Sequence, residues 1–206
     1  MSIQHSRIYL ASQSPRRREL LKQVGVRYEA LLLRNDTRRE IDVDETPLDG
    51  EIPADYVQRE CREKAVVGWN TLALRSLPPF PVLAADTTVA LDGKIIGKPD
   101  NHKHAAEILH MLSGTQHQVL TAVAIALGER VEMRLSITTI TFDTLSEERI
   151  SRYLHTGEAH DKAGAYGIQG HAGAFVKRID GSYSGVMGLP LYETIELLKL
   201  FGYPAP

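Results

Sequence analysis

Residues 82–97, VLAADTTVALDGKIIG, decide the class of fold. The apolar run Val82–Leu91 predicts a strand, and the Asp92-Gly93 pair after it is a common turn between two antiparallel strands. Residues 94–97 then form the returning strand of a hairpin. Because such a hairpin interrupts the alternation of strands and helices, a purely parallel, doubly wound sheet is not expected.

A second hairpin, of strands 117–127 and 131–142, supports the same conclusion. Short strands are also predicted at 7–11, 26–34 and 174–179. Helical spacing of apolar residues, together with capping residues and prolines, predicts five helices, at 15–24, 53–74, 100–112, 146–154 and 190–201. The expected fold is therefore an α/β protein with a mixed sheet and helices on its outside.

The composition is that of a globular protein, and we expect a single domain over residues 1–206. The formal net charge of -2 argues against nucleic acid as a partner. Cys61 is the single cysteine, which excludes an internal disulfide framework and a cysteine-based zinc site. No run approaches the roughly 20 apolar residues of a membrane span, and the N-terminus lacks the pattern of a signal peptide. A cytoplasmic protein without a membrane partner is expected.

Three arginines, Arg16 to Arg18, follow Ser14-Pro15 in the first turn of a predicted helix. The helix dipole places partial positive charge at this end, so each cation there is disfavoured by roughly some tenths of a kcal/mol. A bound anion would reverse the effect, because free N–H groups and guanidinium groups would point at it. The alternative is that the arginines extend into water and the cost is tolerated.

Carboxylates that suit a divalent cation occur in two places. Asp86 lies within an apolar strand, where a lone carboxylate is costly to bury unless it is paired or holds a metal. The alternative is that Asp86 ends the strand and caps a turn. An acidic loop could hold Mg²⁺ or remain solvated; its carboxylates are Asp42, Asp44, Glu45, Asp49 and Glu51.

Two lysines and a glycine-rich stretch complete the candidates. Lys64 either faces a site or pairs with Glu60 on the helix surface. Lys98 directly follows a predicted strand, at an exit where ligands often bind. Residues 161–170, DKAGAYGIQG, allow close approach of the backbone to a ligand, and Gln169 could read a base edge through its amide. The histidines lack a metal-binding spacing, and Cys61 falls among core positions.

Seven stretches, in this order, carry a resemblance to a known family. They are LASQSPRRRELL (10–21), IDVDETPLDGE (41–51), YVQRECREKA (56–65), AADTTVALDGKIIGKP (84–99), LSGTQHQVLTAVA (112–124), DKAGAYGIQG (161–170) and GSYSGVMGLPLYET (181–194). From about Arg7 to Gly202, the chain resembles the Maf-like nucleoside triphosphate pyrophosphatases. Glu60 is a departure, because leucine is common at its position in that family.

The resemblance implies hydrolysis of a nucleoside triphosphate between the α and β phosphates, with Mg²⁺ or Mn²⁺ as cofactor. It also implies a homodimer and a mixed, twisted sheet with two lobes around a cleft, related to the inosine-triphosphate pyrophosphatases. The resemblance assigns catalytic roles to Asp86, Glu45, Lys64 and Lys98. Glu45 and Asp86 would also bind the metal. The substrate would be bound by Ser14, Arg16, Arg17, Thr87, Lys162 and Gln169.

Two stretches, AADTT and KAGAYGIQG, resemble the branch of the family that acts on dTTP, UTP and modified pyrimidine nucleotides. Such an enzyme would remove these nucleotides from the pool. One alternative is the branch that favours 7-methyl-GTP. Another is a non-catalytic regulator that binds nucleotide or nucleic acid and influences septum formation. The full set of acids and lysines favours an enzyme.

Overall fold

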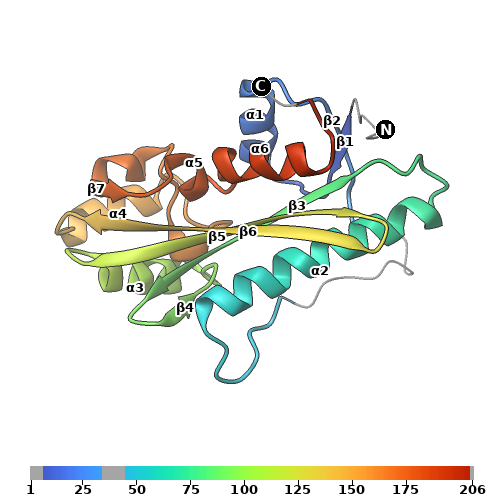
Figure 1. The fold of residues 1–206 in the computed structure, drawn as a ribbon. Helices are drawn as coiled ribbons and strands as arrows, with labels where there is room; N and C mark the ends of the chain where they lie inside the picture. The colour runs from blue at the N-terminus through green and yellow to red at the C-terminus, as the bar shows by residue number, and fades with distance from the viewer. Residues whose placement is uncertain (1–6, 34–44, 205–206) are drawn as a thin grey trace.

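The computed structural model describes residues 7–33 and 45–204, and its centre is a seven-stranded sheet (Figure 1). The strands follow the order β2-β1-β3-β5-β6-β7, and β4 pairs with β3. The β1–β2 and β1–β3 pairs are parallel and the other pairs are antiparallel, which confirms the mixed sheet. The strands are β1 (Ile8–Leu10), β2 (Tyr28–Ala30), β3 (Val82–Leu91), β4 (Lys94–Ile96), β5 (Gln116–Leu127), β6 (Arg130–Phe142) and β7 (Val176–Asp180).

The five predicted helices are confirmed, with ends that differ from the prediction by two residues or fewer. They are α1 (Pro15–Gln23), α2 (Pro53–Leu74), α3 (His102–Leu112), α4 (Glu147–Leu154) and α6 (Leu191–Leu200). The sequence analysis did not predict the short helix α5 (Tyr183–Val186) or the 3₁₀ turns at Ala163–Ala165 and His171–Phe175. Each of these three elements is too short to show a periodic pattern.

Apolar residues cover both faces of the sheet, because side chains alternate between the faces along β3 and β5. On one face, Ala84 and Ala122 pack with Val57 and Cys61 of α2. On the other face, Leu83, Val123 and Ile125 join a larger core that includes α1, α3, α4 and α6. Figure 1 shows α2 running along one face, with α1 and α6 across the other. The burial of Cys61 confirms its prediction as a core residue.

A gap in the sheet leaves the middle of β3 open along one edge. On that edge, β1 pairs with Val82 and Leu83, and β4 pairs with residues 89–91. Within the described part of the chain, no strand pairs with residues 84–88 on that side. Asp86 and Thr87 therefore lie in mid-strand beside open space, and the alternative that Asp86 ends the strand is wrong.

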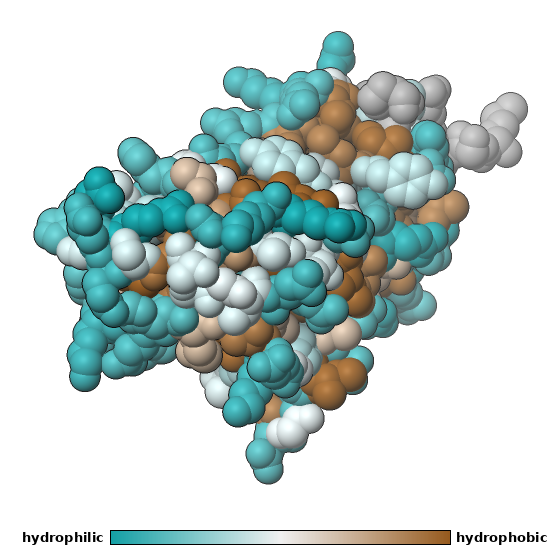
Figure 2. Space-filling model, turned by 90° about the vertical axis from the view of Figure 1, so that its left-hand side faces the viewer, coloured by the Kyte–Doolittle hydropathy of each residue, from teal (hydrophilic) through white to brown (hydrophobic). Residues whose placement is uncertain are grey.

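The face formed by the α3 and α4 end of the molecule is mainly hydrophilic (Figure 2). Exposed hydrophobic residues are interspersed among the polar residues and do not cover the face. This agrees with the burial of the apolar residues of α4, namely Ile150, Tyr153 and Leu154. Among the helices in residues 7–33 and 45–204, none has the length and apolar character needed to span a membrane.

Candidate functional site

A cavity of about 540 Å³ brings all ten predicted site residues together. Its wall is formed by residues 11–17, 31 and 33, 85–87, 161–163, 166–169 and 186–188, together with Glu45, Lys64, Val89, Lys98 and Val119. A volume of this size suits a small-molecule ligand. The open middle of β3 contributes Asp86 and Thr87 to this wall.

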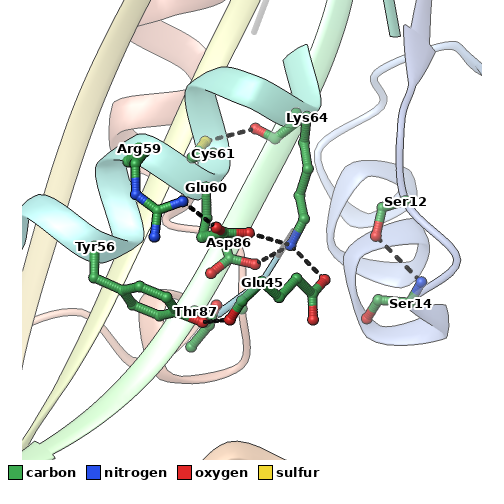
Figure 3. Close-up of polar contacts among 12 residues, drawn as sticks. Ser12, Ser14, Glu45, Tyr56, Arg59, Glu60, Cys61, Lys64, Asp86 and Thr87 are labelled. Carbon is green, nitrogen blue, oxygen red and sulfur yellow. Dashed lines mark hydrogen bonds and ion pairs between the residues drawn. The ribbon is translucent and has the colours of Figure 1, made fainter. Parts of the chain in front are cut away.

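The Lys64 ammonium lies between two carboxylates in this cavity (Figure 3). Because α2 packs across β3, the Lys64 Nζ is 2.6 Å from the Asp86 Oδ1, and it is 2.8 Å from the Glu45 Oε1. The Glu60 Oε2, predicted as a surface partner of Lys64, is farther from the Nζ at 3.7 Å. Lys64 and Asp86 each keep 15% of their side-chain surface exposed, so both face the cavity but are largely shielded from water.

Electrostatic contacts favour the charged forms of Lys64 and Glu45. Burial acts to lower the pKa of Lys64, but the charge and hydrogen bond of Asp86, followed by those of Glu45, raise it above its ordinary value. Burial acts to raise the pKa of Glu45, but Lys64 and Lys98 lower it below its ordinary value. The Lys98 Nζ is 3.6 Å from the Glu45 Oε2, and the Lys98 side chain is 60% exposed, so it remains available to a ligand.

The start of α1 presents unpaired donors to the cavity. Ser14 occupies the N-cap position, but its side chain makes no capping hydrogen bond, and its N–H donates to the Ser12 Oγ at 3.2 Å. Arg16 lines the cavity, and no hydrogen bond or salt bridge joins its guanidinium to another side chain in residues 7–33 or 45–204, although its charge acts on Asp161. A helix N-terminus with a free hydroxyl and a free guanidinium suits a phosphate group.

Arg17 also lines the cavity, but unlike Arg16 its guanidinium is engaged by the protein. Its Nε donates to the Gly188 carbonyl at 2.7 Å, its Nη1 to the Ser12 Oγ at 3.2 Å, and its Nη2 to the Thr87 Oγ1 at 3.3 Å. Burial lowers the pKa of Arg17, although the charge of Asp86 opposes this effect. Arg17 therefore connects α1 to β3 and to the segment before α6.

The glycine-rich segment contributes residues 161–163 and 166–169 to the cavity wall. The Lys162 Nζ donates to the Glu158 carbonyl at 2.7 Å and to the Asp161 Oδ1 at 2.5 Å, and Gln169 lines the cavity. Gly164 has φ of +72°, and a Cβ there would lie 2.9 Å from the Val89 Cγ2. Glycine at this position thus allows the segment to approach β3 closely.

The carboxylates fit a divalent cation only in part. Residues 7–33 and 45–204 contain no group of three or more His, Cys, Asp or Glu side chains that could hold a metal ion. Glu45 and Asp86 nevertheless converge on one cation, the Lys64 ammonium. Two carboxylates suit Mg²⁺, which commonly takes its remaining ligands from substrate phosphates and water. Asp42 and Asp44 lie outside the described residues.

The sequence analysis missed three residues that line the cavity, Ser12, Tyr166 and Gly188, and it missed the burial of Glu60. Ser12 belongs to the same motif as Ser14 and could have been found there. Tyr166 lies within the glycine-rich segment. Gly188 contributes a carbonyl oxygen, for which the sequence gives no signal. Glu60 is fully buried against the cluster, although a glutamate four residues before a lysine usually indicates an exposed helix pair.

The sequence of the chain is similar to that of known proteins over most of its length. The model of the family described as Maf-like protein matches residues 7–201. A dTTP/UTP pyrophosphatase of Nitrosomonas europaea is 57% identical over 195 residues, covering 95% of this chain and 94% of its own length. One from Aromatoleum aromaticum is 55% identical and covers 97% of each chain.

A solved structure, the Ham1 protein of Staphylococcus aureus, shares 14% identity and a TM-score of 0.43, covering 66% of this chain and 72% of its own. That likeness is too weak to support an argument. The family match spans almost the whole chain, and the alignments with the two relatives cover nearly the full length of both proteins. The chain belongs to the Maf-like protein family.

Proposed function

We propose that this protein is a nucleoside triphosphate pyrophosphatase that hydrolyses dTTP and UTP to the monophosphate and pyrophosphate. The observation that carries the proposal is the Lys64 ammonium held between Asp86 and Glu45 in a cavity that also contains the start of α1. The two dTTP/UTP pyrophosphatases of similar sequence support the same reaction and substrates.

The cavity residues suit attack of water on the α-phosphorus. Ser14 and Arg16 offer donors to phosphate oxygens, and Lys64 and Lys98 offset negative charge on the departing pyrophosphate. Asp86 orients the water or accepts its proton as the new oxygen–phosphorus bond forms. The bond between the α-phosphorus and the bridging oxygen then breaks, and pyrophosphate leaves.

We also propose that Glu45 and Asp86 hold a divalent cation, Mg²⁺ or Mn²⁺. When bound, such an ion supplies positive charge to the phosphate oxygens. For the base, the Gln169 amide offers one acceptor and one donor to the O4 and N3–H edge of thymine or uracil. The proposals of one domain, a homodimer and a cytoplasmic location rest on the sequence and the family resemblance.

The test is pyrophosphate release from dTTP, UTP, CTP, GTP, ATP, 5-methyl-UTP and 7-methyl-GTP, with Mg²⁺ or Mn²⁺. We expect metal-dependent turnover of dTTP and UTP. Asp86→Asn should reduce kcat by about 100-fold or more while leaving nucleotide binding detectable. Asp92→Asn is the matched control, because Asp92 lies on the same hairpin but outside the cavity, and asparagine tolerates its φ of +50°.

Each other outcome would change the conclusion. Undiminished kcat in the Asp86→Asn variant would reject the role of Asp86. Turnover confined to 7-methyl-GTP would keep the chemistry and reject the assignment of Gln169. Binding of nucleotides without any turnover by folded wild-type protein would favour the regulatory alternative.

A further inference from the structure

A buried hydrogen bond connects the glycine-rich wall of the cavity to the central sheet. The His117 Nε2 on β5 is 2.8 Å from the Tyr166 hydroxyl. His117 is 2% exposed and Tyr166 is 5% exposed, so water does not compete for the bond. The two residues are 49 positions apart in the sequence, and the bond joins the central sheet to the segment that carries Gln169.

The surroundings of His117 leave it one polar partner. Its Nδ1 is buried without a hydrogen-bond partner in the part of the chain that the structure describes. The Phe142 ring packs edge-on against both His117 and Tyr166, at centroid distances of 4.8 Å in each case. Burial lowers the pKa of His117 to about 4, so the ring is neutral at neutral pH. The aromatic packing and the single hydrogen bond fix Tyr166 in one orientation.

The position of Tyr166 in turn restricts the backbone of the segment that carries Gln169. It directly follows Gly164 and Ala165, whose φ values of +72° and +58° turn the chain sharply. The next residue, Gly167, donates its N–H to the Tyr153 hydroxyl at 3.3 Å. Gln169 lies three residues after Tyr166 and faces the cavity. A shift of the Tyr166 ring would therefore be transmitted along a short, constrained segment to the Gln169 amide.

We propose that His117 is a positioning residue for base selection, which acts through the Tyr166 hydroxyl on the segment that carries Gln169. This inference rests on the proposed function, because it concerns how the same cavity selects a pyrimidine base. Asp86 and Lys64 lie on β3 and α2, which the His117–Tyr166 bond does not join. The bond should therefore affect KM and base preference more than kcat.

The test compares kcat and KM for UTP and CTP, which differ at the base edge that Gln169 would meet. Tyr166→Phe keeps the ring and removes the hydroxyl, whereas His117→Leu removes the partner. His117→Gln is the conservative variant, since its amide can occupy the place of the Nε2. The matched control is Tyr203→Phe, because Tyr203 is also 5% exposed, and its hydroxyl accepts from the Arg27 N–H outside the cavity.

We expect Tyr166→Phe and His117→Leu to raise the KM for UTP by roughly tenfold, the size of effect typical for one lost buried hydrogen bond. The UTP-to-CTP ratio of kcat/KM should fall by a similar factor, with kcat within about twofold of wild type. The variant carrying both changes should lose no more of the UTP preference than either single variant, because all three variants lack the same His117–Tyr166 hydrogen bond. His117→Gln should recover part of the preference, and Tyr203→Phe should leave it unchanged.

The inference would be overturned by an unchanged UTP-to-CTP ratio in Tyr166→Phe, or by a fall in kcat alone. An equal fall for both nucleotides would show a general structural effect and would also overturn it. If His117→Leu does not fold, Tyr166→Phe decides the question. Failure of the proposed function is distinct, because wild-type protein would then release no pyrophosphate from either nucleotide.

Discussion

Replacing Glu60 with glutamine should stabilise the protein at pH 8 and leave its stability nearly unchanged at pH 5. The carboxyl of Glu60 is fully buried on α2. Its Oε1 accepts from the Arg59 Nη1 at 2.7 Å (Figure 3). Its Oε2 has no hydrogen-bond partner among the described residues and only an ion-pair contact with the Lys64 Nζ at 3.7 Å. Burial, aided by the charge of Asp86, raises the pKa of Glu60 to about 7 despite the opposing charge of Lys64.

The direction of this pH dependence follows from the number of protons that Glu60 binds in the folded and unfolded chain. Between pH 4.5 and 7, Glu60 keeps its proton in the folded chain and has lost it in the unfolded chain. The contribution of Glu60 protonation to the free energy of unfolding is therefore fully present below pH 4.5, falls as the pH rises through this window, and is lost above pH 7. The difference between the two pKa values corresponds to roughly 3 kcal/mol, of which about 2–3 kcal/mol is lost between pH 5 and 8.

Glutamine removes this pH dependence without removing the acceptor that Arg59 uses. Arg59 also keeps its paired contacts with Glu51, at 2.8 and 2.9 Å. The free energy of unfolding of Glu60→Gln, relative to wild type, should therefore rise by about 2 kcal/mol between pH 5 and pH 8.

Urea unfolding of wild type and Glu60→Gln at pH 5 and pH 8 measures this difference. Glu63→Gln is the matched control, because Glu63 lies on the same helix and 3.7 Å from the Arg59 Nη1 but is 44% exposed. The control should show no comparable pH-dependent gain. If the free energies of unfolding of Glu60→Gln and wild type differ by the same amount at both pH values, the reasoning is refuted. A buried carboxyl with a raised pKa must make the free energy of unfolding depend on pH.

Three further variants test the cavity wall. Arg17→Lys should lower the free energy of unfolding by about 1–3 kcal/mol, since an ammonium cannot reproduce the planar contacts to Gly188 and its neighbours; urea unfolding equal to wild type would contradict this role. Gly164→Ala should destabilise by about 2 kcal/mol, because of the positive φ and the contact with Val89, so an unchanged Tm would argue against a rigid segment. Gln169→Glu should reduce the preference for UTP over CTP several-fold, because a carboxylate cannot donate to the base; an unchanged nucleotide profile would remove Gln169 from base selection.

Local signals were sufficient to predict most elements of this fold. Pro53 at a helix start and the proline-rich stretch after residue 77 define α2, which the structure places at Pro53–Leu74. The Asp92-Gly93 turn defines the hairpin of β3 and β4, and the left-handed φ values of both residues, +50° and +75°, explain why these two residue types stand there. Strand β2 is shorter than predicted, because at the sheet edge it pairs only along Ile8–Leu10.

The sequence alone thus determined the order of strands and helices, the mixed sheet and the types of side chain available for phosphate chemistry, because these follow from spacing along the chain. Only the tertiary structure decided which of these groups meet. Lys64 faces Asp86 and Glu45 because α2 crosses β3 where β1 has ended and β4 has not begun. The same packing buries Glu60 and turns Arg17 toward Gly188. Burial and charge pairing depend on contacts between residues far apart in the chain, and no local pattern encodes them.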